Sequence, residues 1–306
     1  MASEARSTRL FERDPALSSL FSYIENIRGI DFGLYRHATV VRKTALRLEK
    51  TGCSTYDQYL AYLTQHPDEL DELIDELTIK VSNFFRNPVV FEVLHDIVLP
   101  EIAARFGYLK VWSLGCAKGE EPYSIAILVH DLMKKAGLKA NLSLLGTDLC
   151  DGAVEKAAQG LYRESDLAET KKRYVDTYFR RVSPSPSSGT RSHAGLQNEA
   201  AFLKEDRYLL IDEIRAMTQF ECADVLSALK SPHAPPEFNL ILCRNLMIYM
   251  NKSLQQEVLS QIADLLPLGG YLVIGQSETI LDSFNGVFSQ PFPEIKIFRK
   301  VAPFSV

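Results

Sequence analysis

From about residue 109 onward, short apolar segments alternate with stretches that have the pattern of helices. The apolar segments are LKVWSLG (109–115), LSLLGTD (142–148), TQFEC (218–222), FNLILCRN (238–245) and GYLVIGQS (270–277). The helical stretches are 121–136, 151–159, 224–230 and 253–266. Apolar strands that alternate with helices are typical of a parallel sheet covered on both faces. The sequence therefore predicts an α/β domain, to which IKIFRK (295–300) adds a late antiparallel strand.

The chain before this pattern, from about residue 15 to 90, is expected to be helical. Apolar residues recur at helical spacing and define one stripe of a helix; they are Leu34, Ala38, Val41, Ala45 and Leu48. Basic residues fall within a narrow arc on the opposite side, where we expect solvent; they are Arg36, Lys43, Arg47 and Lys50. The segment DELDELIDEL (68–77) predicts a second helix, acidic outside and apolar inside. We therefore expect a helical domain over 1–90 and an α/β domain over 91–306.

A long excursion separates the second and third predicted strands, from about residue 160 to 216. Its segment SPSPSSGTRSHAG (183–195) is rich in Ser, Pro and Gly, which is typical of a flexible loop. RYLLID (207–212) has the pattern of a short strand. We interpret the excursion as a small subdomain inserted into the α/β domain.

The composition excludes several classes of protein. A net charge of −5 argues against a dedicated nucleic-acid binder. The N-terminus has no apolar segment of the kind that signal peptides carry, and no run of about 18 apolar residues could cross a membrane. The five cysteines form no C-x-x-C pair and the six histidines are dispersed, so we expect neither a disulfide framework nor a metal site. These features indicate a reduced, cytoplasmic protein.

The segment VWSLGCAKGEEPYSIAI (111–127) contains the first candidate site. Its strand ends in a glycine loop, and parallel α/β sheets bind ligands at the carboxyl ends of their strands. The loop is neither a Walker A loop nor a complete dinucleotide fingerprint. The two acids that follow, Glu120 and Glu121, would repel a pyrophosphate. Acids also stabilise a helix N-terminus; we expect Glu120 to serve there and Glu121 to contact a ligand.

Acidic residues follow the next two strands as well. Asp148 ends the second strand, and Asp224 follows the third. Because an ionised carboxylate only accepts hydrogen bonds, Asp148 suits ribose hydroxyls and Asp224 suits the amino group of adenine. A ligand with adenosine, no phosphate and a positive centre satisfies all these acids. S-adenosylmethionine, which carries a sulfonium and an ammonium group, is such a ligand.

Several segments, taken in order, closely resemble the chemotaxis receptor methyltransferases of the CheR family. They are GIDFGLYR (29–36), LTIKVSNFFRNP (77–88), VWSLGCAKGEEPYSIAI (111–127), GTDLCDGAVEKAAQGLY (146–162), CRNLMIYM (243–250) and GGYLVIGQSE (269–278). The family transfers methyl groups from S-adenosylmethionine to receptor glutamates. The resemblance covers nearly the whole chain. It implies an N-terminal all-helical domain, a Rossmann-like methyltransferase domain with a small inserted β-subdomain, S-adenosylhomocysteine as product, and no metal.

The resemblance also implies roles for matching positions. The implied catalytic residues are Arg86, which meets the carboxylate of the cofactor, and Tyr249, which points toward the site of methyl transfer. The implied cofactor-binding residues are Lys80, Ser82, Arg86, Glu121, Asp148, Asp224, Val225, Cys243, Arg244 and Asn245. Among them Glu121 holds the ammonium group, Asp148 the ribose, and Asp224 with Val225 the adenine. The segment 243–245 forms the floor, largely through its backbone.

Two lysines depart from the family pattern. Lys80 stands where some receptor methyltransferases have an asparagine, and Lys118 stands where a threonine or serine is common. These departures are the support for an alternative function, a non-catalytic module that binds S-adenosylmethionine and signals to a partner. A nicotinamide-dependent dehydrogenase is a further alternative, against which the incomplete glycine fingerprint and the acids argue.

The resemblance gives the basic face of the 34–50 helix a use. Receptor methylation sites lie on long helices with acidic residues, which Arg36, Lys43, Arg47 and Lys50 could steer to the site. The other reading is that this face is only solvated. The inserted subdomain resembles one that grips a tethering peptide in some relatives by strand addition. The expected partners are thus the cytoplasmic helices of chemoreceptors, with recruitment of a cytoplasmic enzyme to membrane receptor arrays.

Overall fold

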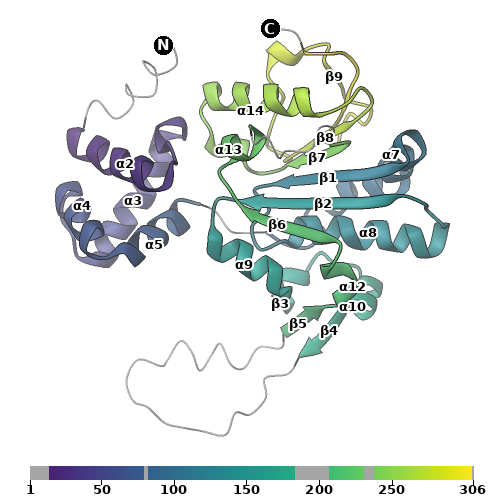
Figure 1. Cartoon of the computed structure of the whole chain (residues 1–306), viewed down its shortest axis with the longest axis horizontal. Helices are drawn as coiled ribbons and strands as arrows, with labels where there is room; N and C mark the ends of the chain where they lie inside the picture. The colour runs from purple at the N-terminus through teal and green to yellow at the C-terminus, as the bar shows by residue number, and fades with distance from the viewer. Residues whose placement is uncertain (1–13, 79–81, 183–206, 231–237, 305–306) are drawn as a thin grey trace, which may run out of the picture.

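The N-terminal part of the molecule is a bundle of helices. The computed structural model describes residues 14–78, 82–182, 207–230 and 238–304 (Figure 1). The bundle consists of α2 (Pro15–Arg28), the 3₁₀ turn η1 (Phe32–Leu34), α3 (His37–Thr51), α4 (Tyr56–Gln65) and α5 (Pro67–Leu77). Asp14 caps α2 by accepting from the N–H groups of Ala16 and Leu17. The core of the bundle includes Leu20, Ile24, Tyr59, Leu63 and Leu73.

Helix α3 packs on the bundle with a face that differs in part from the expected one: Arg36 and Lys50 are exposed and Val41 and Leu48 pack on the core, as predicted, but two basic residues are buried. Lys43 and Arg47, predicted to face solvent, are only 6% and 9% exposed as whole residues, and this part of the prediction is wrong. Ala38 and Ala45, predicted to be buried, are exposed. The apolar stems of Lys and Arg can cover core surface when their charged ends find partners. α5 supplies those partners, so pairing between the helices decides which face of α3 is inside.

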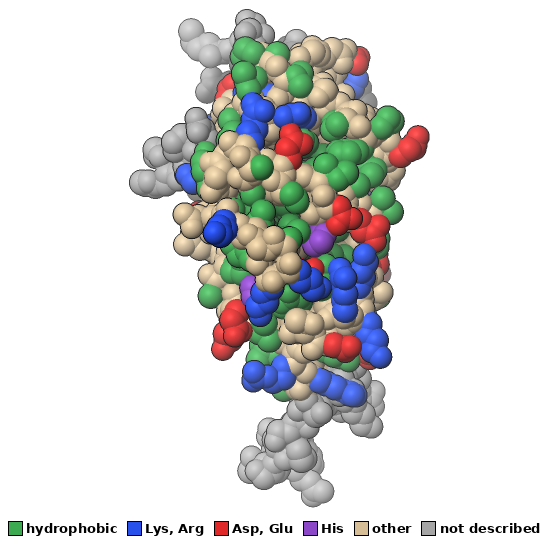
Figure 2. Space-filling model, turned by 90° about the vertical axis from the view of Figure 1, so that its right-hand side faces the viewer, with side chains coloured by type: hydrophobic (Ala, Val, Ile, Leu, Met, Phe, Trp, Pro, Cys, Tyr) green, Lys and Arg blue, Asp and Glu red, His purple; other side chains and the backbone are tan. Residues whose placement is uncertain are grey.

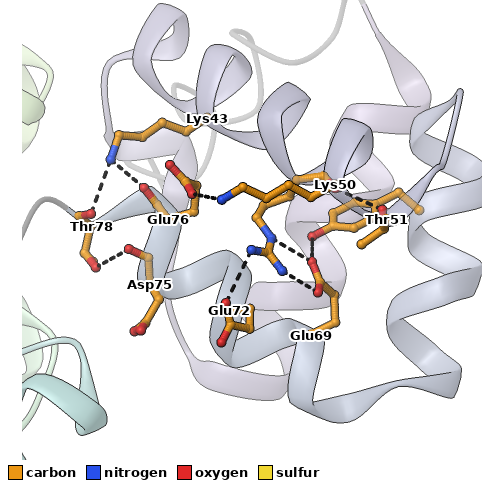
Figure 3. A network of polar contacts seen from close by, with 10 residues as sticks. Lys43, Lys50, Thr51, Glu69, Glu72, Asp75, Glu76 and Thr78 are labelled. Atoms are coloured by element: carbon orange, nitrogen blue, oxygen red, sulfur yellow. Dashed lines mark hydrogen bonds and ion pairs between the residues drawn. The ribbon is translucent and has the colours of Figure 1, made fainter. Parts of the chain in front are cut away.

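The contacts between α3 and α5 are ionic and partly buried (Figure 3). The guanidinium of Arg47 donates to both carboxylate oxygens of Glu69, at 2.9 and 2.6 Å. The hydroxyl of Tyr59 donates to the same carboxylate at 2.7 Å. Lys43 donates to the backbone carbonyl of Glu76 at 2.5 Å, while Lys50 pairs with the Glu76 carboxylate at 3.0 Å nearer the surface. The sequence predicted that all acids of α5 face solvent. This prediction is wrong for Glu69, which is buried against α3.

The second part of the molecule is an α/β unit built on one sheet. Its strands are β1 (Tyr108–Leu114), β2 (Asn141–Asp148), β6 (Thr218–Cys222), β7 (Leu240–Cys243), β8 (Tyr271–Ile274), β9 (Phe288–Ser289) and β10 (Ile297–Lys300). They lie in the order β6-β2-β1-β7-β8-β10-β9. The first five in this order run parallel, and β10 is antiparallel to β8 and β9. The predicted α/β fold with a late antiparallel strand is confirmed.

Helices cover both faces of this sheet. They are α6 (Pro88–Val93), the π-helical turn η2 (Leu94–Val98), α7 (Leu99–Phe106), α8 (Glu120–Ala136), α9 (Asp151–Gln159), α13 (Val225–Leu229) and α14 (Lys252–Leu265), with 3₁₀ turns η4 (Met247–Tyr249) and η5 (Asp282–Phe284). One apolar core lies under α6–α8 and a second under α13 and α14. Figure 1 shows the helical bundle beside the edge at which β1 and β2 end. The division of the chain near residue 90 stays a prediction.

The excursion between β2 and β6 contains a small antiparallel sheet. β3 (Leu161–Arg163), β5 (Arg207–Leu210) and β4 (Phe179–Val182) pair in that order, accompanied by η3 (Glu164–Leu167), α10 (Lys172–Tyr178) and α12 (Asp212–Arg215). Figure 2 shows many Lys and Arg side chains on the lower half of the face where this subdomain lies. The loop predicted at 183–195 lies outside the described residues. Among the described helices, none is both long and apolar enough to traverse a bilayer.

Candidate active site

A cleft lies at the carboxyl ends of β1, β2 and β7 and has two halves. Gly115, Asn245 and Tyr249 line both halves and mark their junction. One half, which we call the acidic half because Asp148 lines it, is also lined by Phe32, Tyr35, Thr78, Leu149 and Val225. The other half, which we call the arginine half because Arg86 and Arg244 line it, is also lined by Ser82, Ala117, Glu121 and Ile248. Residues from the helical bundle, the glycine loop and the segment after β7 therefore meet in one place.

Asp148 holds the glycine loop in position. One carboxylate oxygen accepts from the N–H of Ala117 at 2.8 Å, and the other accepts from the N–H of Cys150 at 3.0 Å. Ala117 has a φ of 50° and Gly119 a φ of 87°, both in the left-handed region. A side chain at Gly119 would also meet Ala157 at 2.9 Å, so this position requires glycine. Because a carboxylate has about four acceptor sites, Asp148 has the chemistry to accept from a hydroxyl group in the cleft as well.

Glu121 and Arg244 form a buried pair in the arginine half. Arg244 donates to one carboxylate oxygen of Glu121 at 3.0 Å, and Ser113 donates to the other at 2.8 Å. Arg244 also donates to the backbone carbonyl of Arg86 at 2.7 Å, and only 2% of its side chain is exposed. The sequence analysis had assigned 243–245 a role largely through backbone. The side chain of Arg244 instead joins Glu121 to the segment that carries Arg86.

Glu120 is not the charged acid at the helix end that the sequence predicted. Its side chain is 0% exposed, and neither carboxylate oxygen has a hydrogen-bond partner among the described residues. Burial raises the pKa of the Glu120 carboxyl to about 8, although nearby backbone N–H groups and Lys118 oppose the rise. The Glu120 carboxyl is therefore mostly neutral at pH 7.

Arg86 reaches the cleft from a strained segment between the two domains. Its neighbours Phe85 and Asn87 have φ values of 56° and 62°, which non-glycine residues rarely adopt. The N–H of Phe85 donates to Ser124 on α8 at 3.0 Å, which fixes the segment against the sheet domain. Phe85 is 4% exposed, as expected for a core residue. Burial raises the pKa of the Tyr249 phenol, and nearby Arg86 offsets part of this rise, so the hydroxyl is protonated.

Glu278, which the sequence analysis gave no role, orders the junction of the two halves. It is 4% exposed and accepts from the N–H groups of Asn245 at 3.0 Å and Ile248 at 3.2 Å. These bonds hold Asn245 at a φ of 58°. A side chain at Gly275 would lie 2.7 Å from the Glu278 carboxylate, so this close approach requires glycine. A buried acid in a loop has no periodicity that would reveal such a role from the sequence.

Other predicted site residues lie elsewhere. Asp224 is not among the lining residues; it caps α13 by accepting from the N–H groups of Leu226 and Ser227, and Val225 lines the cleft beside it. Cys243 is completely buried in the core under α14 and does not line the cleft. Lys80 lies outside the described residues.

The helical bundle contributes two aromatic residues that the sequence analysis missed. Phe32 and Tyr35 line the acidic half. Tyr35 forms an isolated antiparallel β-bridge with Met250, in which the N–H of Arg36 donates to the carbonyl of Tyr249 at 2.8 Å. The only available signal was that GIDFGLYR is one of the segments that resemble the family.

The two halves differ in the chemistry that they can bind. The acidic half combines apolar walls with the acceptor Asp148, which suits a nucleoside with ribose hydroxyls. The arginine half combines Arg86 with the pair of Glu121 and Arg244, which suits a group that carries both an ammonium and a carboxylate. Among the described residues, no cluster of three or more His, Cys, Asp or Glu side chains could hold a metal ion. The cleft thus fits an adenosine joined to an amino acid.

Comparisons with known proteins agree with this geometry. Residues 15–78 match the CheR methyltransferase all-alpha domain, and residues 80–191 and 192–295 match the CheR methyltransferase SAM-binding domain. The chain is 32% identical to the chemotaxis protein methyltransferase of Klebsiella aerogenes, over 82% of this chain and 78% of the relative. It is 30% identical to the protein of the same description in Salmonella typhimurium, over 88% of this chain and 85% of the relative.

A solved magnesium protoporphyrin IX methyltransferase from Synechocystis with bound SAM is a more distant likeness. It is 13% identical over 66% of this chain and 70% of its own, with a TM-score of 0.31, a value at which the likeness carries no argument. The two family models together cover nearly all of the sequence, each over the part of the chain whose fold it describes. This chain belongs to the CheR methyltransferase family.

Proposed function

We propose that this enzyme transfers methyl groups from S-adenosylmethionine to glutamate side chains of chemoreceptors, and leaves glutamate methyl esters and S-adenosylhomocysteine. One observation carries the proposal: Tyr249 lies at the junction of a nucleoside-binding half and an amino-acid-binding half, and Arg86 lies beside it. The sulfonium of the cofactor joins those two parts, so the methyl group belongs at that junction. The family and the names of the relatives support the same activity.

The cofactor would be held from both sides of the cleft. In the acidic half, Asp148 binds the ribose and Val225 packs against the adenine. In the arginine half, Glu121 binds the ammonium group, and Arg86, with the polar side chain of Ser82, binds the carboxylate. Asp224 acts indirectly, because it caps the helix that begins at Val225. The carboxylate of Glu121 keeps an acceptor position for the ammonium beside its bond from Arg244.

The chemistry requires positioning and no general base. When bound, S-adenosylmethionine supplies an electrophilic methyl group on its sulfonium. A glutamate side chain has an ordinary pKa near 4.3 and arrives ionised, so no residue of the enzyme has to remove a proton. Arg86 and the protonated hydroxyl of Tyr249 orient the incoming carboxylate and exclude water from it. The described cleft accordingly has no histidine among its lining residues.

The receptor helix would lie along the outward face of α3. Arg36, the N-cap residue of α3, and Arg42 on the helix itself are exposed, whereas Lys43 and Arg47 are buried and not available for docking. Arg36 caps the N-terminus of α3 without a side-chain bond, at the end where the helix dipole disfavours a cation. The guanidinium of Arg36 therefore does not stabilise its own helix. The backbone N–H of Arg36 donates to the backbone carbonyl of Tyr249. The Arg36 cation is well placed to attract an acidic helix.

The test is transfer of a radiolabelled methyl group to membranes that contain chemoreceptors. We expect label on the receptor that alkali releases as methanol, because carboxyl methyl esters hydrolyse at high pH and methylated amines do not. A Tyr249→Phe variant, with the ring retained, should bind S-adenosylhomocysteine normally and transfer more slowly. Binding of S-adenosylhomocysteine without transfer to any receptor would favour the alternative, a non-catalytic module. The proposal places the enzyme in the cytoplasm, recruited to receptor arrays.

A further inference from the structure

The segment between α2 and α3 joins the helical bundle to the catalytic edge of the sheet. Besides the bond from Arg36 to Tyr249, the N–H of Asn251 donates to the carbonyl of Leu34 at 2.9 Å. The two bonds flank Tyr35 and make a short antiparallel pairing with the chain after β7. This pairing fixes the backbone of Tyr35 relative to the cleft, so its side chain has a defined place in the acidic half.

The ring of Tyr35 is supported from behind by the core of the bundle. Phe32 is 2% exposed, and its ring centroid lies 5.3 Å from that of Tyr35 at a tilt of 48°. Phe21 supports Phe32 in turn, with centroids 5.9 Å apart. Tyr35 packs against the core of the bundle and also against the core under α13 and α14. The ring is therefore held between the two cores, and Tyr35 lines the cleft.

The hydroxyl of Tyr35 is a hydrogen-bond donor that lies near several carboxylates. Burial raises the pKa of this phenol above its usual value, and the nearby carboxylates of Asp224, Asp148 and Asp31 raise it further, so it stays protonated. Within the described part of the chain, no hydrogen bond to this hydroxyl is found. A partly buried hydroxyl normally has a partner. A nucleoside in the acidic half would supply acceptors in its ring nitrogens and ribose oxygens.

We infer that Tyr35 is a cofactor-binding residue, whose ring packs on the adenosine and whose hydroxyl donates a hydrogen bond to it, so that the helical bundle supplies one wall of the nucleoside site. The inference rests on the proposed function, because it takes S-adenosylmethionine as the ligand. It adds to that function a binding residue from outside the sheet domain. Tyr35 and α3, along which the receptor helix is proposed to dock, then belong to the same helical bundle.

If Tyr35 binds the cofactor, cofactor binding is coupled to the pairing of the bundle with the chain after β7. A bound adenosine contacts both Val225 of the sheet domain and Tyr35 of the bundle, so it stabilises their pairing. Loss of the pairing would remove Tyr35 from the acidic half and release the backbone of Tyr249 from Arg36. We therefore expect a bound nucleoside to strengthen the pairing of the bundle with the chain after β7.

Calorimetry with two ligands tests the inference in the full-length protein. S-adenosylhomocysteine fills both halves, whereas 5′-methylthioadenosine carries only the nucleoside. Tyr35→Ala should raise the dissociation constant of both ligands by the same factor, about tenfold or more for the loss of an aromatic contact and a hydrogen bond. Tyr35→Phe keeps the ring and should raise both constants about threefold to tenfold. Tyr23→Ala, a tyrosine that packs on the same core and is not among the residues lining the cleft, should leave both constants unchanged.

The outcomes separate this inference from the proposed function. If the wild type binds neither ligand, the proposed function fails. If the wild type binds both and each Tyr35 variant binds them equally well, the inference is overturned and the proposed function stands. If Tyr35→Ala does not fold, Tyr35→Phe decides, together with hydrogen exchange of the wild type. 5′-Methylthioadenosine should slow exchange at the amides of Arg36 and Asn251, and unchanged exchange at both would equally overturn the inference.

Discussion

Replacement of Arg47 by glutamate should strongly destabilise the helical bundle rather than abolish a docking surface. The guanidinium makes two hydrogen bonds to Glu69, whose side chain is 9% exposed, and Tyr59 adds a third. Removal of one partner of a buried ion pair costs about 3–5 kcal/mol. A whole domain is stable by only about 5–15 kcal/mol. Arg47→Glu adds a second carboxylate beside Glu69, so we expect at least the upper end of that loss.

Urea unfolding followed by two signals measures this loss. Trp112 is the single tryptophan and lies in the sheet domain, so its fluorescence reports that domain, while far-ultraviolet circular dichroism reports all helices. The dichroism midpoint should fall sharply in Arg47→Glu. Arg42→Glu, on the exposed side of the same helix, should stay within about 0.5 kcal/mol of the wild type. A double replacement, Arg47→Met with Glu69→Met, should recover part of the stability, because it leaves no unpaired charge, although the buried Tyr59 hydroxyl loses its acceptor.

The acid side of the stability curve gives an independent check of the same pair. Burial raises the pKa of the Glu69 carboxyl, but hydrogen bonds from Arg47 and Tyr59 outweigh this and leave it below its ordinary value. A lowered pKa stabilises the fold fully above the unfolded value of about 4.3 and progressively less as the pH falls below it. An Arg47→Glu protein with wild-type midpoints at pH 7 would refute the whole argument, since it would mean that the pair contributes nothing.

Other predictions concern the cleft and its surroundings. Asp148→Ala should raise the dissociation constant of S-adenosylhomocysteine about a hundredfold, because two bonds to a charged acceptor are lost; a change of less than threefold in calorimetry would contradict the ribose role. Glu120 has its pKa raised to about 8, so the folded state holds a proton that the unfolded state releases above about pH 4.3. Its contribution to stability should therefore decline from that pH to about pH 8, by about 1.4 kcal/mol per pH unit, and Glu120→Gln should remove this slope from a series of unfolding curves. Arg36→Glu with Arg42→Glu should slow methyl transfer to receptors about tenfold or more with an unchanged dissociation constant for S-adenosylhomocysteine, whereas exposed Lys139→Glu should have no effect; equal rates in all three proteins would leave α3 without a docking role.

The strands of the sheet were predictable because each is a continuous apolar run. TQFEC (218–222) is β6 to the residue, and GYLVIGQS (270–277) contains β8. Strands in a doubly covered sheet need apolar side chains on both faces, so the sequence has little freedom there. The short strands β3 and β4 of the inserted subdomain were missed because β3 has only three residues and β4 is mostly exposed, so neither contains such a run.

The orientation of α3 was not predictable from its own residues. Its alanines and its basic residues define two opposite faces, and a hydrophobicity rule places the alanines inside. The burial of Lys43 and Arg47 follows from contacts with another helix, α5, on which Glu69 pairs with Arg47 and the carbonyl of Glu76 accepts from Lys43. Interactions between helices of unlike charge enter no periodicity calculation on a single helix.

The cleft was partly predictable because its residues follow strands. Asp148, Glu121 and Asn245 all line it, as the rule for parallel sheets indicates. Tyr35 comes from a different domain, and no rule about strand ends could include it. The neutral state of Glu120 depends on complete burial, which two adjacent glutamates in a sequence do not reveal.

The bridge between Tyr35 and Met250 also sets an order of events during folding. The helical bundle consists of contacts between neighbours along the chain, which form quickly, whereas the parallel sheet needs pairings between distant segments, which form slowly. Met250 follows β7, the strand that lies beside β1. The bundle therefore cannot form its bridge to Met250 in the native position until these distant strands have paired. We therefore expect the bundle to form early during synthesis, before its pairing partner is in place. We expect the acidic half of the cleft to be completed among the last parts of the molecule. Refolding experiments should accordingly recover the helical signal of the bundle before they recover cofactor binding.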